Sequence, residues 1–173
     1  SMNQVEYFGR GPAENYLDRN AGSMVGLYKS TAEELYFPYV RPQENGHHTD
    51  TRWVSLSTGK KGLLIQADNT IGFNALRNSI EDFDDEEATG LSRQWSNFTP
   101  EQVANHDEAA AKNVLRRQHH INNITPRDFV EVCVDLKQQG VAGYDSWGSR
   151  PEPAYTLPAN REYNWGFTLI PLK

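Results

Sequence analysis

The chain has 173 residues, of which 37% are apolar and 11% aromatic, and its formal net charge is −6. The acidic balance, without a clustered basic surface, excludes a typical nucleic-acid-binding domain, and no apolar run is long enough to span a membrane. The aromatic content argues against disorder and suits a sheet with solvated faces, or a surface whose rings stack on sugars.

The chain is long enough for one hydrophobic core, so we expect a single domain. Ser1 before Met2 is typical of a cleaved tag, and we interpret residues 1–4 as a cloning scar or flanking residues. The domain, residues 5–173, begins with a short predicted strand at 5–8. That strand runs into an irregular packed loop rich in glycine, proline and asparagine.

Residues 34–48 form a second aromatic stretch, which Pro38 and Pro42 interrupt. Proline donates no hydrogen bond to a strand ladder, so this stretch is expected to be edge strand or extended loop. Asn45 and Gly46 then predict a turn.

Regular strands are predicted next. The segments 51–58 and 61–68 flank Gly59, and this pattern is typical of a β-hairpin. A third strand is expected at 71–78.

The middle of the chain is polar and carries the helical signal. Residues 99–117 begin with Thr99 as a predicted N-cap and predict one helix, or two short ones with a break near Asn105. The acidic run 81–87 holds six carboxylates, which are normally solvated. A calcium loop stays an open alternative there, although the spacing does not match an EF-hand.

Two later segments, 127–139 and 161–172, alternate apolar and polar residues with period two, which predicts strands. Cys133, in the first of them, is the only cysteine, which excludes an internal disulfide and a cysteine-based zinc site; we expect a buried thiol. The alternating residues are Val130, Val132, Val134 and Leu136 in the first segment and Tyr163, Trp165, Phe167 and Leu169 in the second. Many short strands, frequent turns and one helical excursion together indicate an all-β fold, an antiparallel β-sandwich.

Most motifs that carry chemistry are missing. The chain has no glycine-rich phosphate loop, no G-x-S-x-G sequence and no H-E-x-x-H sequence. Its two histidine pairs, 47–48 and 119–120, are adjacent, and neighbours on a strand face opposite sides, so we assign no metal ligand. Carboxylates are plentiful, but nothing singles out two of them as a glycosidase pair, so we assign no catalytic residue.

The clearest functional candidate is Trp147, which lies in a loop of turn-forming residues, 140–153. An indole buries much apolar area, so a tryptophan in such a loop is either a cap folded onto the core or an exposed platform for a sugar ring. Local side-chain bonds from Asp145 and Ser146 favour a rigid turn. The other residues that shape the turn are Gly143, Gly148, Pro151 and Pro153.

Four segments of the chain resemble the C-terminal domain of the large bacterial β-galactosidases of glycoside hydrolase family two. They occur in the family's order and with similar spacing, and with the intervening strands they cover nearly the whole chain. Residues 107–119 depart from the pattern and are interpreted as a surface insertion. The four segments are 9–19, 36–53, 98–107 and 140–148.

The resemblance implies a large antiparallel β-sandwich of the galactose-mutarotase type, a supersandwich, of which this chain holds only the C-terminal part. It places the two reacting glutamates, and most ligands of the enzyme's Mg²⁺ and Na⁺, in domains that this sequence does not contain. We therefore expect no catalytic residue, metal or cofactor in this chain, and no activity when it is alone.

The resemblance also implies a role for Trp147 as an aromatic wall of the sugar site in a retaining β-galactosidase. Asp145, His47 and Arg52 are expected substrate-binding residues; for Arg52 a buried ion pair is the alternative. The partners implied are β-galactosides such as lactose, the other domains of the longer chain and further copies of it, with no nucleic acid or membrane.

Two rival functions stay open: an autonomous carbohydrate-binding module, and a purely structural or oligomerisation domain. The sequence does not decide between a cytoplasmic and a periplasmic location.

Overall fold

The computed structural model describes residues 2–40, 43–83, 121–145 and 147–173. The chain divides into two compact units, which are treated separately below. The larger unit comprises 1–37, 45–77 and 128–173, and the smaller unit comprises 38–44 and 78–127. The predicted helix at 99–117, and the acidic run from residue 84 onward, lie outside the described residues.

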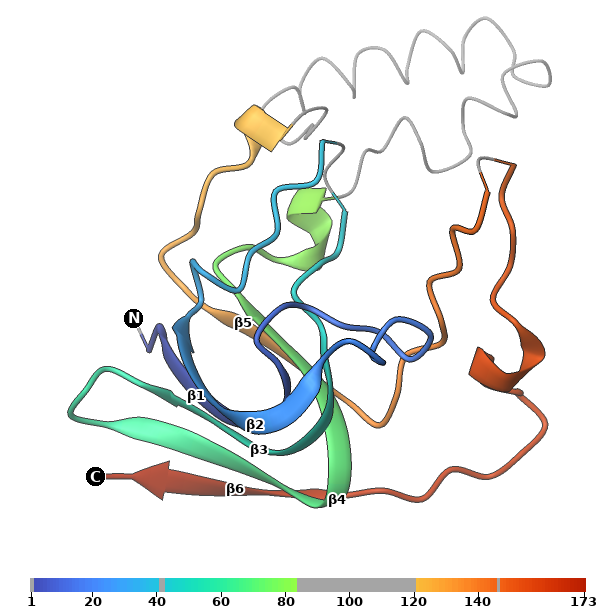
Figure 1. Cartoon of the computed structure of the whole chain (residues 1–173). Coiled ribbons are helices and arrows are strands. Elements are labelled where there is room, and N and C mark those ends of the chain that lie inside the picture. The colour runs from blue at the N-terminus through green and yellow to red at the C-terminus, as the bar shows by residue number, and fades with distance from the viewer. Residues whose placement is uncertain (1, 41–42, 84–120, 146) are drawn as a thin grey trace, which may run out of the picture. The chain divides into compact units, whose positions relative to one another are not determined.

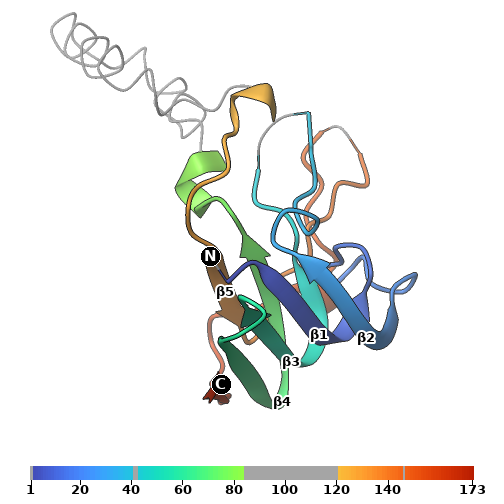
Figure 2. The ribbon, with the colours of Figure 1, turned by 90° about the vertical axis from the view of Figure 1, so that its left-hand side faces the viewer.

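The larger unit is built on one antiparallel sheet. Five strands lie side by side in the order β2-β1-β3-β4-β5, and β6 pairs with β4 beside this path (Figures 1 and 2). The strands are β1 (Gln4–Gly11), β2 (Met24–Thr31), β3 (His48–Ser57), β4 (Gly62–Leu76), β5 (Glu131–Asp135) and β6 (Phe167–Leu172).

One face of this sheet carries the core. Along β1, Val5 and Tyr7 are buried while Phe8 on the opposite face is exposed, the alternation that a half-buried strand requires. The Tyr7 ring packs edge-on against Phe73, with ring centroids 5.1 Å apart. The predicted strand at 5–8 is confirmed and extends further, to Gly11.

The hairpin around Gly59 is confirmed. The Thr58 N–H donates to the Lys61 carbonyl at 2.9 Å, and Gly59 has a φ of +83°, which glycine adopts without strain. The turn joins β3 and β4 in an antiparallel pair whose register runs from Trp53↔Gln66 to Ser57↔Gly62.

The prediction of separate strands at 61–68 and 71–78 is wrong, because β4 runs unbroken over fifteen residues. Its first half, Gly62–Ala67, pairs with β6 and its second half, Gly72–Leu76, pairs with β5 (Figure 1). The register of β3 on β4 is irregular between Thr51 and Trp53, which pair with Ile71 and Gln66 of β4.

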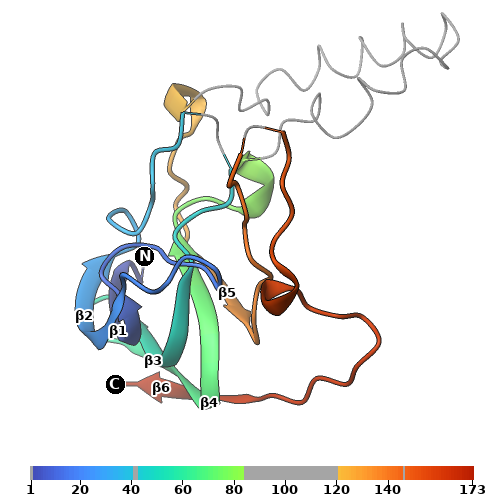
Figure 3. The ribbon, with the colours of Figure 1, turned by 45° about the vertical axis from the view of Figure 1, so that its right-hand side comes forward.

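The two C-terminal strands exist but are shorter than predicted. β5 covers only 131–135, since only Gly72–Leu76 of β4 is available to pair with it. β6 begins at Phe167 rather than near 161, and the segment before it runs outside the sheet, as Figure 3 shows. Cys133 on β5 is half-buried.

Within the smaller unit, Asp82 organises the described residues. Burial raises the pKa of Asp82, but hydrogen bonds from Arg127, Asn78 and the Ser79 N–H outweigh it and lower that pKa. The Asn78 side-chain amide also donates to the Thr125 carbonyl at 2.9 Å.

The described parts of the chain are therefore mostly β, with an antiparallel sheet and no α-helix. They contain three 3₁₀-helices, η1 (Ile80–Phe83), η4 (Ile121–Asn123) and η5 (Pro153–Tyr155). Among residues 34–40 and 43–48, none before His48 belongs to a strand, which agrees with the extended loop expected there. No helix in the described ranges is long and apolar enough to cross a membrane.

Candidate functional site

Three of the segments singled out in the sequence meet in the larger unit. Residues 9–19 bond to residues 45–52 at the start of β3, and they also bond to the base of the loop 140–148. The fourth segment, 98–107, lies outside the described residues. The candidate site is thus assembled from parts of the chain more than a hundred residues apart.

Asn15 forms the centre of this junction and is fully buried. Its side-chain amide donates to the carbonyls of Arg10 and Ala13 at 3.0 and 3.1 Å. Its Oδ1 accepts from the Thr49 N–H at 3.0 Å and from the Thr49 hydroxyl at 2.5 Å, and its own N–H donates to the His47 carbonyl. Both donors and the acceptor of a buried amide are satisfied, which fixes the loop to the sheet.

Gly46, where the sequence predicts a turn with Asn45, lies at the same junction, although residues 43–47 have no regular turn in the structure. Gly46 has a φ of +74°, and a Cβ there would lie 2.8 Å from the Leu35 carbonyl oxygen, so the position requires glycine. Its N–H donates to a carboxylate oxygen of Glu14 at 2.7 Å.

His47 is buried, with 1% of its surface exposed. Its ring stacks on Tyr16 with centroids 5.7 Å apart, and Nδ1 lies 3.2 Å from the Asn74 side-chain oxygen. The ring lies directly over β4 at Gly72, where a Cβ would come within 2.5 Å of Nε2. A sugar contact by His47 stays a prediction.

His48 points the other way and lies between two backbone carbonyls. Its Nδ1 is 2.9 Å from the Gly46 oxygen and its Nε2 is 3.2 Å from the Pro12 oxygen. Burial lowers the pKa of His48 below its usual value, although the two carbonyls oppose the shift. The ring is therefore neutral near pH 7, where it carries one N–H and donates to one carbonyl at a time.

Arg52 lies half-buried on the sheet face that bears Phe8, and its guanidinium lies 5.6 Å from the centre of the Phe8 ring. It also donates to the Asp50 carbonyl. The nearby Asp50, which has a φ of +51°, accepts from Arg10 Nε at 2.5 Å. A sugar contact by Arg52 stays a prediction.

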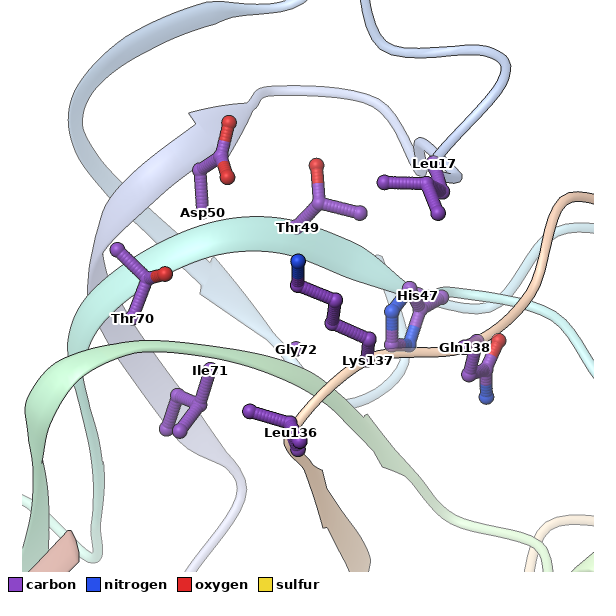
Figure 4. Close-up of a pocket in the computed structure, with 10 residues that line it drawn as sticks. All are labelled: Leu17, His47, Thr49, Asp50, Thr70, Ile71, Gly72, Leu136, Lys137 and Gln138. Atoms are coloured by element: carbon purple, nitrogen blue, oxygen red, sulfur yellow. The ribbon is translucent and has the colours of Figure 1, made fainter. Parts of the chain in front are cut away.

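A small cavity of about 40 Å³ lies beside His47. Figure 4 shows Lys137 extending from the segment after β5 toward Thr49. The volume suits an ordered water and is too small for a sugar ring. The cavity is lined by Leu17, His47, Thr49, Asp50, Thr70, Ile71, Gly72, Leu136, Lys137 and Gln138.

Trp147 is 93% exposed, so its interpretation as a cap over the core is wrong. The turn beneath it is nevertheless ordered by hydrogen bonds: Asp145 Oδ1 accepts from the N–H of Trp147 at 2.8 Å and of Ser149 at 3.3 Å. The Ser149 hydroxyl accepts from the Tyr144 N–H at 3.1 Å. The local bonds predicted for Asp145 are confirmed, and the ring stands outward from a bonded turn.

No group of three or more His, Cys, Asp or Glu side chains in the described ranges is arranged to hold a metal ion. The expectation that this chain holds no metal ion stays a prediction.

Sequence reasoning missed Asp18. Its carboxylate accepts hydrogen bonds from the N–H groups of Val141 and Ala142, across more than 120 residues of chain. No local sequence pattern pairs an aspartate with a loop more than 120 residues away. The one hint in the sequence is that Asp18 and this loop lie in two of the four segments that resemble the family.

Comparison with known proteins gives consistent matches. A protein family described as the beta-galactosidase small chain matches residues 1–169. A beta-galactosidase of Priestia megaterium is 34% identical over 173 residues, which cover 99% of this chain and 14% of that protein. A beta-galactosidase of Streptococcus thermophilus is 29% identical over 170 residues, with 97% of this chain and 14% of that protein covered. The chain thus spans about one seventh of the length of these relatives.

Proposed function

We propose the following function for this chain, which belongs to the beta-galactosidase small-chain family. In a longer β-galactosidase that hydrolyses β-galactosides such as lactose with retention, the chain supplies Trp147 as an aromatic wall at the mouth of the sugar site. The reacting glutamates lie in another part of that protein. One observation carries the proposal: the ring is 93% exposed while its turn is held by hydrogen bonds.

The physical basis is preorganisation. A flat indole presented by a rigid turn stacks on the C–H face of a pyranose without losing much conformational entropy. By analogy with aromatic pairs, such stacking contributes about 0.5–1.5 kcal/mol. Asp145 acts through the turn in this proposal, since its Oδ1 accepts from the N–H groups of Trp147 and Ser149.

The proposal includes a finer fold, a supersandwich in which a second layer covers the open face of this sheet. Phe8 and Leu27 pair across β1 and β2 on that face, and they are 38% and 58% exposed. Trp53 on β3 pairs with Phe8 on the same face. Apolar side chains next to one another on an open sheet face favour burial against another layer. That layer would come from another part of the longer protein. We also expect the longer protein to be a homo-oligomer.

The test is Trp147→Ala in the longer β-galactosidase that contains this chain. We expect KM for lactose to rise about three- to tenfold, which corresponds to about 0.7–1.4 kcal/mol, with a smaller change in kcat. Trp147→Phe should retain most of the affinity because it keeps a flat ring. Trp165→Ala, at a second exposed tryptophan, is the matched control and should leave KM unchanged. If KM rises and kcat falls by the same factor, the result would contradict a ground-state stacking role.

The rival functions give different results with the 173-residue chain alone. We expect no hydrolysis and no saturable change in tryptophan fluorescence on titration with lactose, because the wall lacks the rest of its pocket. Saturable binding in the millimolar range would favour an autonomous carbohydrate-binding module. Self-association in sedimentation, with KM unaffected by Trp147→Ala, would favour a purely structural domain.

A further inference from the structure

The loop that carries Trp147 is attached at its base to a distant carboxylate. Asp18 Oδ1 accepts from the Val141 N–H at 3.0 Å, and Asp18 Oδ2 accepts from the Ala142 N–H at 2.8 Å. Successive backbone N–H groups in a turn make a concave site for an anion, and charge-assisted bonds of this kind are stronger than neutral ones. Each carboxylate oxygen thus holds one residue of the loop.

The backbone at this point needs such support. Ala142 has a φ of +55°, which is uncommon for a residue with a Cβ and costs free energy unless its surroundings hold it there. Gly143 follows with a φ of +83°. Among the described contacts, the bond from the Ala142 N–H to Asp18 is the one that ties this strained residue to the rest of the unit.

Gly140 leaves the space that the carboxylate occupies. A Cβ at Gly140 would lie 2.5 Å from Asp18 Oδ2 and 2.7 Å from its Cγ, closer than real Cβ atoms come to other atoms. The same glycine is fixed on its other side, because its N–H donates to the Tyr155 carbonyl at 2.7 Å. The glycine is required here for close approach, without any need for a positive φ.

Asp18 is itself held firmly. It lies in a tight turn in which the Arg19 N–H donates to the Tyr16 carbonyl at 2.8 Å. Tyr16 stacks on the buried His47, and Asn15 beside it is fully bonded to the start of β3. The carboxylate is therefore anchored to the core of the larger unit through its own short loop.

We propose that Asp18 is the positioning residue for Trp147: its carboxylate clamps residues 141–142 and thereby sets where the exposed indole stands. The role in sugar binding rests on the proposed function, whereas the clamp itself does not. An amide at position 18 cannot replace the carboxylate, since only one of its two terminal atoms accepts a hydrogen bond.

The first experiment uses the 173-residue chain and no sugar. Asp18→Asn should accelerate hydrogen exchange at the Val141 and Ala142 amides at least tenfold, and it should lower the heteronuclear NOE of the Trp147 indole N–H. Gly140→Ala should do the same by displacing the carboxylate. Asp128→Asn, at a fully exposed aspartate, is the matched control and should change neither reading.

Two results would overturn the clamp. One is unchanged exchange and unchanged indole mobility in Asp18→Asn while the β4 amides keep their protection. The other is an additive effect in the Asp18→Asn/Gly140→Ala double variant, because two changes that break one clamp should not add. If Asp18→Asn does not fold, Gly140→Ala tests the clamp by itself, through hydrogen exchange at Val141 and Ala142 and the heteronuclear NOE of the Trp147 indole.

Kinetics of the longer enzyme separate this inference from the proposed function. Asp18→Asn should raise KM for lactose more than it lowers kcat, and it should add nothing in a Trp147→Ala background. If Trp147→Ala raises KM and Asp18→Asn does not, the positioning role fails alone. If Trp147→Ala leaves KM unchanged, the proposed function fails, while faster exchange in Asp18→Asn still supports the clamp.

Discussion

Two regions of the larger unit are built from similar residues and differ in what they bury. The buried junction, made of Asn15, His47, His48 and Thr49, and the exposed turn, residues 143–149, are both rich in polar and turn-forming residues. In the junction the side chains of Asn15, His47 and His48 are enclosed and meet hydrogen-bond partners. In the turn the backbone is bonded while the largest side chain stands in solvent.

The comparison shows that burial decides whether polar and turn-forming residues contribute to stability or leave a side chain available for binding. A buried polar group left without its partner costs about 1–3 kcal/mol, so the junction is expected to contribute stability. An exposed side chain contributes little to folding, so Trp147 is available for binding. The following predictions test this contrast.

Between the buried junction and the exposed turn, the larger effect on stability is expected in the junction, for Asn15→Ala. The change leaves the carbonyls of Arg10 and Ala13 and the N–H of Thr49 without their present partner, so the free energy of unfolding should fall by about 3 kcal/mol. Urea unfolding measures this. Asn164→Ala, at an exposed asparagine whose side-chain amide donates to the nearby Glu162 carboxylate, should change it by less than about 0.5 kcal/mol. A similar fall in the free energy of unfolding in both variants would contradict the difference proposed between buried and exposed polar residues.

An intermediate effect is expected from acid acting on His48. Because burial lowers its pKa in the folded state, the unfolded chain binds this proton more readily. Its contribution to stability is therefore complete above the unfolded value near pH 6.5, and it is lost as the pH falls toward the folded pKa, by at most about 1.4 kcal/mol per pH unit.

Urea unfolding between pH 7.5 and 5.5 measures this loss. The window lies above the range in which Glu33 and Asp82 titrate, since their hydrogen bonds to Arg77 and Arg127 help to hold those pKa values low. In His48→Gln the slope in this window should flatten. A slope that persists unchanged in the variant would assign the titration to another group.

The smallest effect is expected for the stability of Trp147→Ala. With 93% of the ring exposed, the free energy of unfolding should change by less than about 0.5 kcal/mol. Phe73→Ala, at a fully buried ring, should lose about 3–5 kcal/mol in the same thermal or urea measurement. A loss above about 1 kcal/mol in Trp147→Ala would mean that the ring packs against the fold in solution.

Local patterns predicted much of this arrangement correctly. The hairpin at Gly59 and the side-chain bonds of Asp145 depend on residues close in sequence, and both are present; Gly46 has the positive φ of a turn glycine but lies in no regular turn. The boundaries of β4, β5 and β6 were predicted less well, because a strand ends where its partner ends, and those partners lie far away in the sequence.

The candidate site shows the same division. Trp147 was singled out because a large ring among turn-forming residues is unusual, a property of composition alone. Whether that ring is buried or exposed depends on every segment that packs nearby, and composition left both outcomes open. Asp18 was not predicted at all, since its partners Val141 and Ala142 are brought to it by the fold.

The sequence by itself determined the period-two strands, the tight turns and the resemblance to a β-galactosidase domain, because these depend on short-range sterics and on motifs of adjacent residues. Only the tertiary structure decided that His47 is enclosed, that Trp147 is exposed and that Asp18 holds its loop. The physical reason is that burial and long-range hydrogen bonds are properties of the whole packed chain, to which residues far apart in sequence contribute together.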